Sequence, residues 1–104
     1  MSVSYLVQIL VPKVTGQGEQ VSQKWFEAFL NELTEEFGGA TSFLRAPGVG
    51  HWRDGGETER DTIAVVEVMT DELARGYWSS LRKRLERDLA QEEIVIRAQQ
   101  ITRL

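Results

Sequence analysis

The stretch FGGATSFLRAPGVGHWRDGGETERDTIAVVEVMT, residues 37–70, decides the fold. It predicts a helix end at Gly38, a strand over Ala40–Arg53, a glycine-rich turn at residues 54–57 and a return strand over Asp61–Met69. A proline and two glycines interrupt the first of these strands, which indicates an edge strand with a bulge. The stretch therefore predicts a β-hairpin that joins the two halves of the chain.

The segments on either side of this hairpin mirror each other. The hairpin is preceded by a predicted strand over Val3–Val11 and a predicted helix from about Ser22. It is followed by a predicted helix, capped by Thr70 or Asp71 and with acidic residues in its first turn, and by a strand over Glu93–Thr102. Two apolar stripes at helical spacing mark the buried helix faces: Val21, Trp25, Phe26, Phe29, Leu30, Leu33 and Phe37, then Leu73, Tyr77, Trp78, Leu81, Leu85 and Leu89.

This order of elements, β-α-β-β-α-β, is the ferredoxin-like arrangement. Right-handed crossovers then predict an α+β fold with a four-stranded antiparallel sheet, strand order 4-1-3-2, and both helices on one face. The strand over Val3–Val11 is apolar on both faces, as expected for a central strand. A chain of 104 residues has the size of one domain, so residues 1–104 are expected to form a single unit.

Composition excludes several classes of function. The chain has no cysteine, which excludes a disulfide framework, a thiolate metal site and a cysteine nucleophile. Its net charge of −4 argues against a nucleic-acid partner. The first twelve residues resemble neither a signal peptide nor a membrane span, so we expect a cytoplasmic protein. No metal motif or cofactor motif is present, and none is predicted.

The sheet face away from the helices is predicted to be largely apolar. Its residues are Leu6, Gln8 and Leu10, then Ile63, Val65, Glu67 and Met69, and then Val95, Arg97, Gln99 and Ile101. Such a patch is too apolar to remain in water. We expect a homodimer in which two sheets stack face to face or pair at their edges; the alternative is that the hairpin covers the face.

Three segments together carry a family resemblance: Phe37–Thr41, His51–Gly55 and Gln91–Arg97. They resemble a group of small, uncharacterised bacterial proteins of ferredoxin-like fold, related in architecture to the dimeric α/β-barrel superfamily. The resemblance spans nearly the whole chain and supports the fold. That superfamily includes cofactor-independent monooxygenases, haem-dependent enzymes and proteins without known catalysis, so the resemblance implies no particular reaction.

Gln8, Glu67 and Arg97 form the first candidate site. If their strands are neighbours, the three side chains project from one sheet face as a row, which Arg45 joins if the register permits. Arg97 would then bind an anion and Glu67 would act as a base. The alternative is a buried Glu67–Arg97 ion pair that fixes the strand register.

His51 and Trp52 in the hairpin form the second candidate site. His51 is the only histidine and is a candidate general base or axial haem ligand, and Trp52 a candidate ligand-binding side chain. The alternative is a surface histidine beside a tryptophan that packs under the hairpin. A single histidine without a partner at metal-ligand spacing is weak evidence for a metal.

The basic cluster of the second helix predicts no RNA site. It comprises Arg75, Arg82, Lys83, Arg84 and Arg87. The expected sheet lacks the aromatic pattern that stacks bases, so the cluster is interpreted as a solvated helix face. Two functions remain: a non-catalytic or small-molecule-binding homodimer, or a small cofactor-independent enzyme, monooxygenase- or isomerase-like, that uses His51, Glu67 and Arg97.

Overall fold

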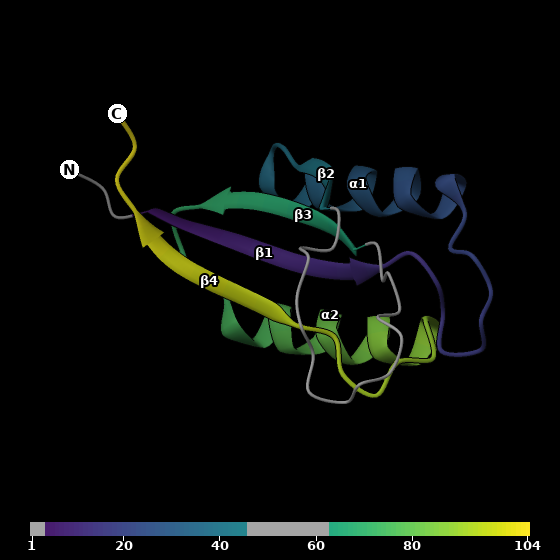
Figure 1. Ribbon diagram of the computed structural model, residues 1–104. Coiled ribbons are helices and arrows are strands. Elements are labelled where there is room, and N and C mark those ends of the chain that lie inside the picture. The colour runs from purple at the N-terminus through teal and green to yellow at the C-terminus, as the bar shows by residue number, and fades with distance from the viewer. Residues whose placement is uncertain (1–3, 46–62) are drawn as a thin grey trace, which may run out of the picture.

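Four strands and two helices make up the part of the chain that the computed structural model describes, residues 4–45 and 63–104, the side chains of residues 42–45 excepted (Figure 1). In chain order they are β1 (Ser4–Pro12), α1 (Gln23–Phe37), β2 (Thr41–Arg45), β3 (Ile63–Thr70), α2 (Arg75–Asp88) and β4 (Ile96–Ile101). The predicted α+β class is confirmed.

The strands form one antiparallel sheet in the order β2-β3-β1-β4, which is the predicted order read from the other edge. β1 lies between β3 and β4, which explains why both of its faces are apolar. Gln8 is the residue of β1 that pairs with Glu67 of β3 on one side and with Arg97 of β4 on the other.

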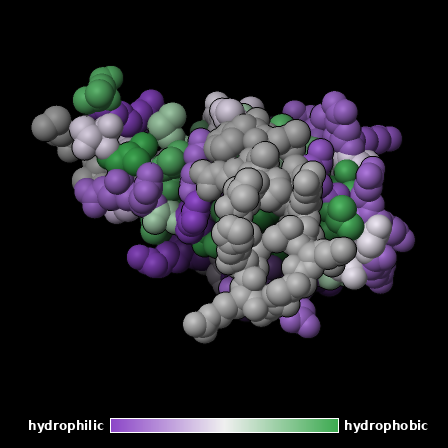
Figure 2. Space-filling view, in the orientation of Figure 1, coloured by the Kyte–Doolittle hydropathy of each residue, from purple (hydrophilic) through white to green (hydrophobic). Residues whose placement is uncertain are grey.

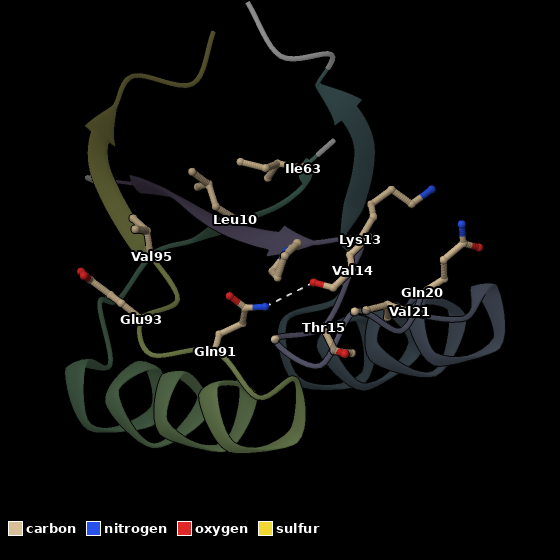
Figure 3. A pocket seen from close by; sticks show the side chains of 13 residues that line it. Leu10, Lys13, Val14, Thr15, Gln20, Val21, Ile63, Gln91, Glu93 and Val95 are labelled. Carbon is tan, nitrogen blue, oxygen red and sulfur yellow. Dashed lines mark hydrogen bonds between the residues drawn. The ribbon is translucent and has the colours of Figure 1, made fainter. Parts of the chain in front are cut away.

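Both helices cover the same face of the sheet and enclose the core; Figure 3 shows them together beneath the strands. The buried side chains of this core are Val7, Ile9 and Val11 of β1, Val66 and Val68 of β3, Phe29 and Leu33 of α1, Trp78, Leu81 and Leu85 of α2, with Leu89 and Ile94 after it. Each fully buried side chain of this size contributes about 1.5–3 kcal/mol. Both predicted helix stripes contribute to the core.

The ends of α1 follow the sequence signals. The Ser22 side chain accepts a hydrogen bond from the Trp25 backbone N–H at 3.1 Å, which satisfies one of the free donors of the first turn. Gly38 ends the helix at φ 83°, a left-handed conformation that glycine adopts without steric cost. Val21 and Phe26, at the two positions of a hydrophobic staple, both pack against the core.

The predicted start of α2 is wrong by about four residues. Thr70 is the last residue of β3, and its hydroxyl donates to the Glu72 carbonyl at 2.9 Å instead of capping a helix. Asp71 accepts a hydrogen bond from the Ser4 hydroxyl at 3.1 Å. The helix begins at Arg75, with Ala74 at the cap position and no acidic residue in its first turn. Thr70 and Asp71 resemble a helix cap in the sequence, but in the structure both residues contact β1.

The first and last residues of β2 and β4 also differ from the predicted ones. β2 is described to Arg45; the expected continuation to Arg53 and the turn at residues 54–57 lie outside the described residues. β4 begins at Ile96 and not at Glu93, because the Ile94 N–H bonds to the Glu86 side chain rather than to a strand.

Candidate functional site

The sheet face opposite to the helices is called the outer face here. Its residues on β1, β3 and β4 are Leu6, Gln8, Leu10 and Pro12; Ile63, Val65, Glu67 and Met69; and Arg97, Gln99 and Ile101. The strand register places these side chains in rows that cross the sheet, and one row is polar. The rows on either side of it are mainly apolar, so the outer face has two apolar halves separated by a polar line.

This polar row is Glu67–Gln8–Arg97, as predicted. The Gln8 Nε2 donates to Glu67 Oε2 at 2.7 Å, and the Arg97 Nε donates to Gln8 Oε1 at 2.9 Å. A carboxylate only accepts and a guanidinium only donates, so these partners fix the orientation of the amide between them. The direct Glu67–Arg97 ion pair is not formed, because β1 lies between β3 and β4 and carries Gln8 into the gap.

The two charged ends of the row keep unused hydrogen-bonding capacity. Gln8 and Glu67 are half-buried and Arg97 is exposed. Within the described residues, Gln8 takes only one of the guanidinium N–H groups and one of the carboxylate oxygens. The row therefore presents a positive end at β4 and a negative end at β3.

A hollow of about 840 Å³ lies at one end of the outer face, next to the polar row (Figure 3). Leu10, Pro12, Ile63 and Val95 supply its apolar surface. Val95 is two residues from Arg97 along the chain, and its carbonyl accepts the Leu10 N–H at 3.0 Å, so it continues the pairing of β4 with β1. Its side chain is 42% exposed. The polar side chains that line the hollow are those of Lys13, Thr15, Gln20, Gln91 and Glu93. The hollow thus combines an apolar floor with polar walls, the usual character of a small-molecule site.

The loop between β1 and α1 forms one wall of the hollow. Val14 pairs with Gln20, and the Thr15 hydroxyl accepts the N–H groups of Gln17 and Glu19, each at 3.2 Å. The Gly16 N–H donates to the Leu89 carbonyl at 3.0 Å, which fastens this loop to the end of α2. The wall is therefore held by hydrogen bonds within the loop and by one backbone hydrogen bond to the end of α2.

Gln91 and Glu93 line the hollow from the segment between α2 and β4. The Gln91 Nε2 donates to the Val14 carbonyl at 3.2 Å, the dashed line in Figure 3, and so joins this segment to the opposite wall. The Gln91 N–H donates to the Glu86 carbonyl at 2.9 Å and the Ala90 N–H to the Arg87 carbonyl at 3.3 Å. These two bonds make a Schellman motif that turns the chain from α2 into the hollow.

Glu86 anchors the same segment through its side chain. Its Oε2 accepts the Ile94 N–H at 2.9 Å and lies 3.1 Å from Arg82 Nη1, and the side chain is 16% exposed. The hydrogen bond from the Ile94 backbone is the main cause that lowers the pKa of the Glu86 carboxyl below its usual value, and Arg82 adds to it. Glu86 therefore holds the segment in its ionised form.

The stability that Glu86 contributes is expected to depend on pH. Because its pKa is lower in the folded chain than in the unfolded chain, the contribution is present above the ordinary pKa of 4.5 and is lost as the pH falls through the folded-state value. Urea unfolding at pH 7 and at pH 3 should show wild type more stable than Glu86→Gln at pH 7, with the difference reduced at pH 3. A difference that stays constant between the two pH values would contradict this role.

The structure brings together three of the six predicted site residues. Gln8, Glu67 and Arg97 form the row. Arg45 does not join it, because Arg45 pairs with Ile63 and Thr41 is the β2 residue opposite Glu67. His51 and Trp52 lie outside the described residues, so only Glu67 remains of the catalytic candidates.

The predictions missed the hollow itself. Its walls come from residues 13–21 and 91–93, segments whose sequences predict a loop and the approach to a strand. The glycine at position 16 is the one sequence feature that relates to the hollow. A side chain there would overlap the backbone of the segment after α2, since an ideal Cβ would lie 1.7 Å from the Ala90 carbonyl oxygen. A glycine of this kind marks close approach of two segments, but the sequence does not say which two.

The helix layer offers a second group of polar and aromatic residues, but it serves the packing of the helices. Arg84 Nη2 lies 2.6 Å from Glu32 Oε2 and links α2 to α1. Phe37 stacks on Trp78 at 5.0 Å. Burial, with Glu32 and Glu36 nearby, raises the pKa of the Tyr77 hydroxyl, so this tyrosine stays neutral near pH 7.

Other kinds of site find no support in residues 4–45 and 63–104. These residues contain no group of three or more histidine, cysteine, aspartate or glutamate side chains able to hold a metal ion, and no helix among them is long and apolar enough to cross a membrane. Hydrophobic and hydrophilic residues lie side by side near the two chain ends in Figure 2.

No protein-family model, curated protein or solved structure matches the chain.

Proposed function

We propose that this chain is a ferredoxin-like protein that binds a small molecule in the hollow of its outer face and acts as a homodimer. The observation that carries the proposal is the hollow of about 840 Å³ with an apolar floor beside the Glu67–Gln8–Arg97 row. Ligand sites commonly enclose about 300–1,000 Å³ and combine apolar walls with a few fixed polar groups. Leu10, Ile63 and Val95 supply the apolar contact, and Lys13, Gln91 and Glu93 supply polar groups in the walls.

Binding is favoured over catalysis because the polar groups are held by structure. Glu67 accepts the Gln8 amide at 2.7 Å, and Arg97 donates to the same amide. A general base needs a carboxylate free to take a proton from a bound substrate. The hydrogen bond from Gln8 occupies one oxygen of Glu67, and Glu67 is not among the described residues that line the hollow, so a ligand held there does not meet this carboxylate.

The homodimer is supported by the half of the outer face that lies on the other side of the row from the hollow. Met69 is 52% exposed there, and Leu6 and Ile101 are half-buried beside it. An exposed methionine among aliphatic side chains is typical of a surface that meets another protein. A second copy of the same face supplies matching apolar surface without a further partner.

Backbone NMR with small probes tests the ligand site. We expect cyclohexanol, benzoate or benzylammonium to cause saturable shifts in the amides of residues 10–16, 63–65 and 93–95, with the helix surfaces unchanged. Val95→Lys should abolish the shifts caused by the neutral cyclohexanol by placing a charge on the floor, whereas Ser79→Lys, an exposed position on α2, should leave them intact. Saturable binding by none of the three probes would overturn the proposal.

A further inference from the structure

We infer that the edge of β4 pairs with the same edge of a second copy, so that two β4 strands run antiparallel about a two-fold axis at Ala98. This inference rests on the proposed homodimer and names the strand that joins its two copies. β4 is the last strand in the sheet order, with β1 on one side and, within the described residues, no strand on the other. Residues 97–100 are exposed, and their side chains alternate between the two sheet faces. The edge of β4 is therefore open over most of its length.

The hydrogen bonds between β1 and β4 identify the backbone groups that face the open edge. The Leu10 N–H donates to the Val95 carbonyl at 3.0 Å, and these residues lie opposite each other in the continued register. Hydrogen-bonded pairs recur at every second residue of an antiparallel ladder, so the odd-numbered residues of β4 bond to β1. The N–H and C=O groups of Ile96, Ala98 and Gln100 therefore point away from β1.

Glu86 marks the place where the open edge begins. The Ile94 N–H also turns away from β1, and the Glu86 carboxylate accepts it at 2.9 Å. For the next residues on this side, Ile96, Ala98 and Gln100, no described residue bonds to the N–H or C=O groups. A further strand along β4 would satisfy all of these groups.

The sequence of β4 lacks the features that usually protect an exposed edge. Proline, bulges and inward-pointing charges commonly prevent such edges from pairing with other chains. β4 has the sequence IRAQQI, without proline or glycine, and its single charged residue, Arg97, bonds to Gln8 on the outer face. Ala98 and Gln100 point to the helix-covered face and are nevertheless exposed, so the helices leave room beside the strand.

The side chains of β4 select one register for pairing with a second copy. The bonding residues of the two strands must lie opposite each other, so the axis passes through a residue near the middle of the strand. An axis at Arg97 sets two guanidinium groups directly opposite each other, which is destabilising. An axis at Gln99 sets Arg97 opposite the apolar side chain of Ile101 of the partner subunit. An axis at Ala98 avoids both mismatches.

The axis at Ala98 pairs polar with polar and apolar with apolar side chains on the outer face. Arg97 then lies opposite the partner's Gln99, whose carbonyl oxygen can accept a guanidinium N–H that Gln8 does not use. Val95, which is 42% exposed, lies opposite the partner's Ile101. Because Val95 lines the hollow, the partner subunit also contributes an apolar side chain beside the proposed ligand site.

Self-pairing also explains why assembly would stop at two copies. The two-fold axis uses the same edge of both chains, so neither β4 remains open after the pair has formed. The two sheets then continue into each other with their outer faces on one side. The strand is its own matching partner, which an extended segment of unrelated sequence is not.

Single cysteines test the register, because the chain has no cysteine of its own. Ala98→Cys places two thiols across the axis, where the Cα atoms of a hydrogen-bonded pair lie about 5.5 Å apart, within the span of a disulfide. We expect oxidation with diamide to convert most of this variant into a covalent dimer. Arg97→Cys and Gln99→Cys are the matched controls: their thiols lie on diagonal positions about 7–8 Å apart and should crosslink several-fold less.

Proline tests whether the edge bonds hold the two copies together. Ala98→Pro removes an N–H that faces the open edge, so each chain keeps its bonds to β1. We expect a folded protein by circular dichroism whose self-association, measured by sedimentation, is about tenfold or more weaker than that of wild type. Gln99→Pro is the matched control, because it removes an N–H that bonds to β1 and should lower the stability of the chain itself.

The outcomes separate this inference from the proposed function. A crosslink in Ala98→Cys, with loss of the dimer in Ala98→Pro, supports the inference. Stronger crosslinking of Arg97→Cys or Gln99→Cys would indicate another register and overturn it. A wild-type dimer that persists in Ala98→Pro and is not crosslinked in Ala98→Cys would overturn the inference and leave the proposed homodimer standing. A wild type that is monomeric at every concentration would overturn the proposed homodimer and this inference with it.

Discussion

Ile9→Ala is expected to lower the free energy of unfolding by about 2–5 kcal/mol. Ile9 is 0% exposed and occupies the middle of the helix-covered face of β1, where it pairs with Val66 and Ile96. Removing its three outer carbons leaves a cavity that strands on both sides and helices above cannot fill. Urea unfolding followed by tryptophan fluorescence measures the loss, because Trp78 lies in the same core.

Leu10→Ala is the matched control for this prediction. Leu10 is the next residue of β1 and points to the outer face, where it is half-buried in the floor of the hollow. Its truncation should cost clearly less stability than Ile9→Ala and should instead weaken probe binding in the hollow. Equal losses of stability from the two variants would contradict the assignment of the two faces.

Gly16→Ala is expected to lower the free energy of unfolding by about 1–3 kcal/mol and to weaken probe binding at the same time. An ideal Cβ at residue 16 would lie 1.7 Å from the Ala90 carbonyl oxygen, and a backbone atom cannot rotate aside as a side chain can. The loop must therefore move away from α2, which breaks the hydrogen bond from Gly16 to Leu89 and displaces one wall of the hollow.

Gly39→Ala controls for the change from glycine to alanine itself. Gly39 has no heavy atom within 4 Å of an added Cβ, so its substitution should change stability by less than about 0.5 kcal/mol. If Gly16→Ala proves as mild as Gly39→Ala in both unfolding and probe binding, the close contact between the loop and α2 does not hold the wall.

The parts of the fold that could be predicted are those encoded by local periodicity. The alternation along β1 and β3 assigns Ile9 and Val66 to one face and Gln8 and Glu67 to the other, because a strand reverses its side chains at every residue. Adding the strand order was enough to bring Gln8, Glu67 and Arg97 into one row. The cap at Ser22 was predictable because its signal depends only on neighbours in the chain.

The parts that could not be predicted depend on contacts between distant segments. Thr70 resembles a helix cap, yet the start of α2 is set by the pairing of β3 with Tyr5, at the far end of the chain. Arg45 was a candidate for the polar row until the register of β2 was known. The hollow has walls from residues 13–21 and 91–93, which come together only when the loop reaches α2, and no local pattern reports that contact.

The proposed ligand site and the proposed homodimer both use the outer face. Native mass spectrometry of the freshly purified wild-type protein tests them most directly, since it reports the number of chains and any retained small molecule in one spectrum. We predict a species of twice the 11.8 kDa chain mass that carries a discrete additional mass. A bare monomer at every protein concentration would contradict both the proposed homodimer and the proposed ligand site.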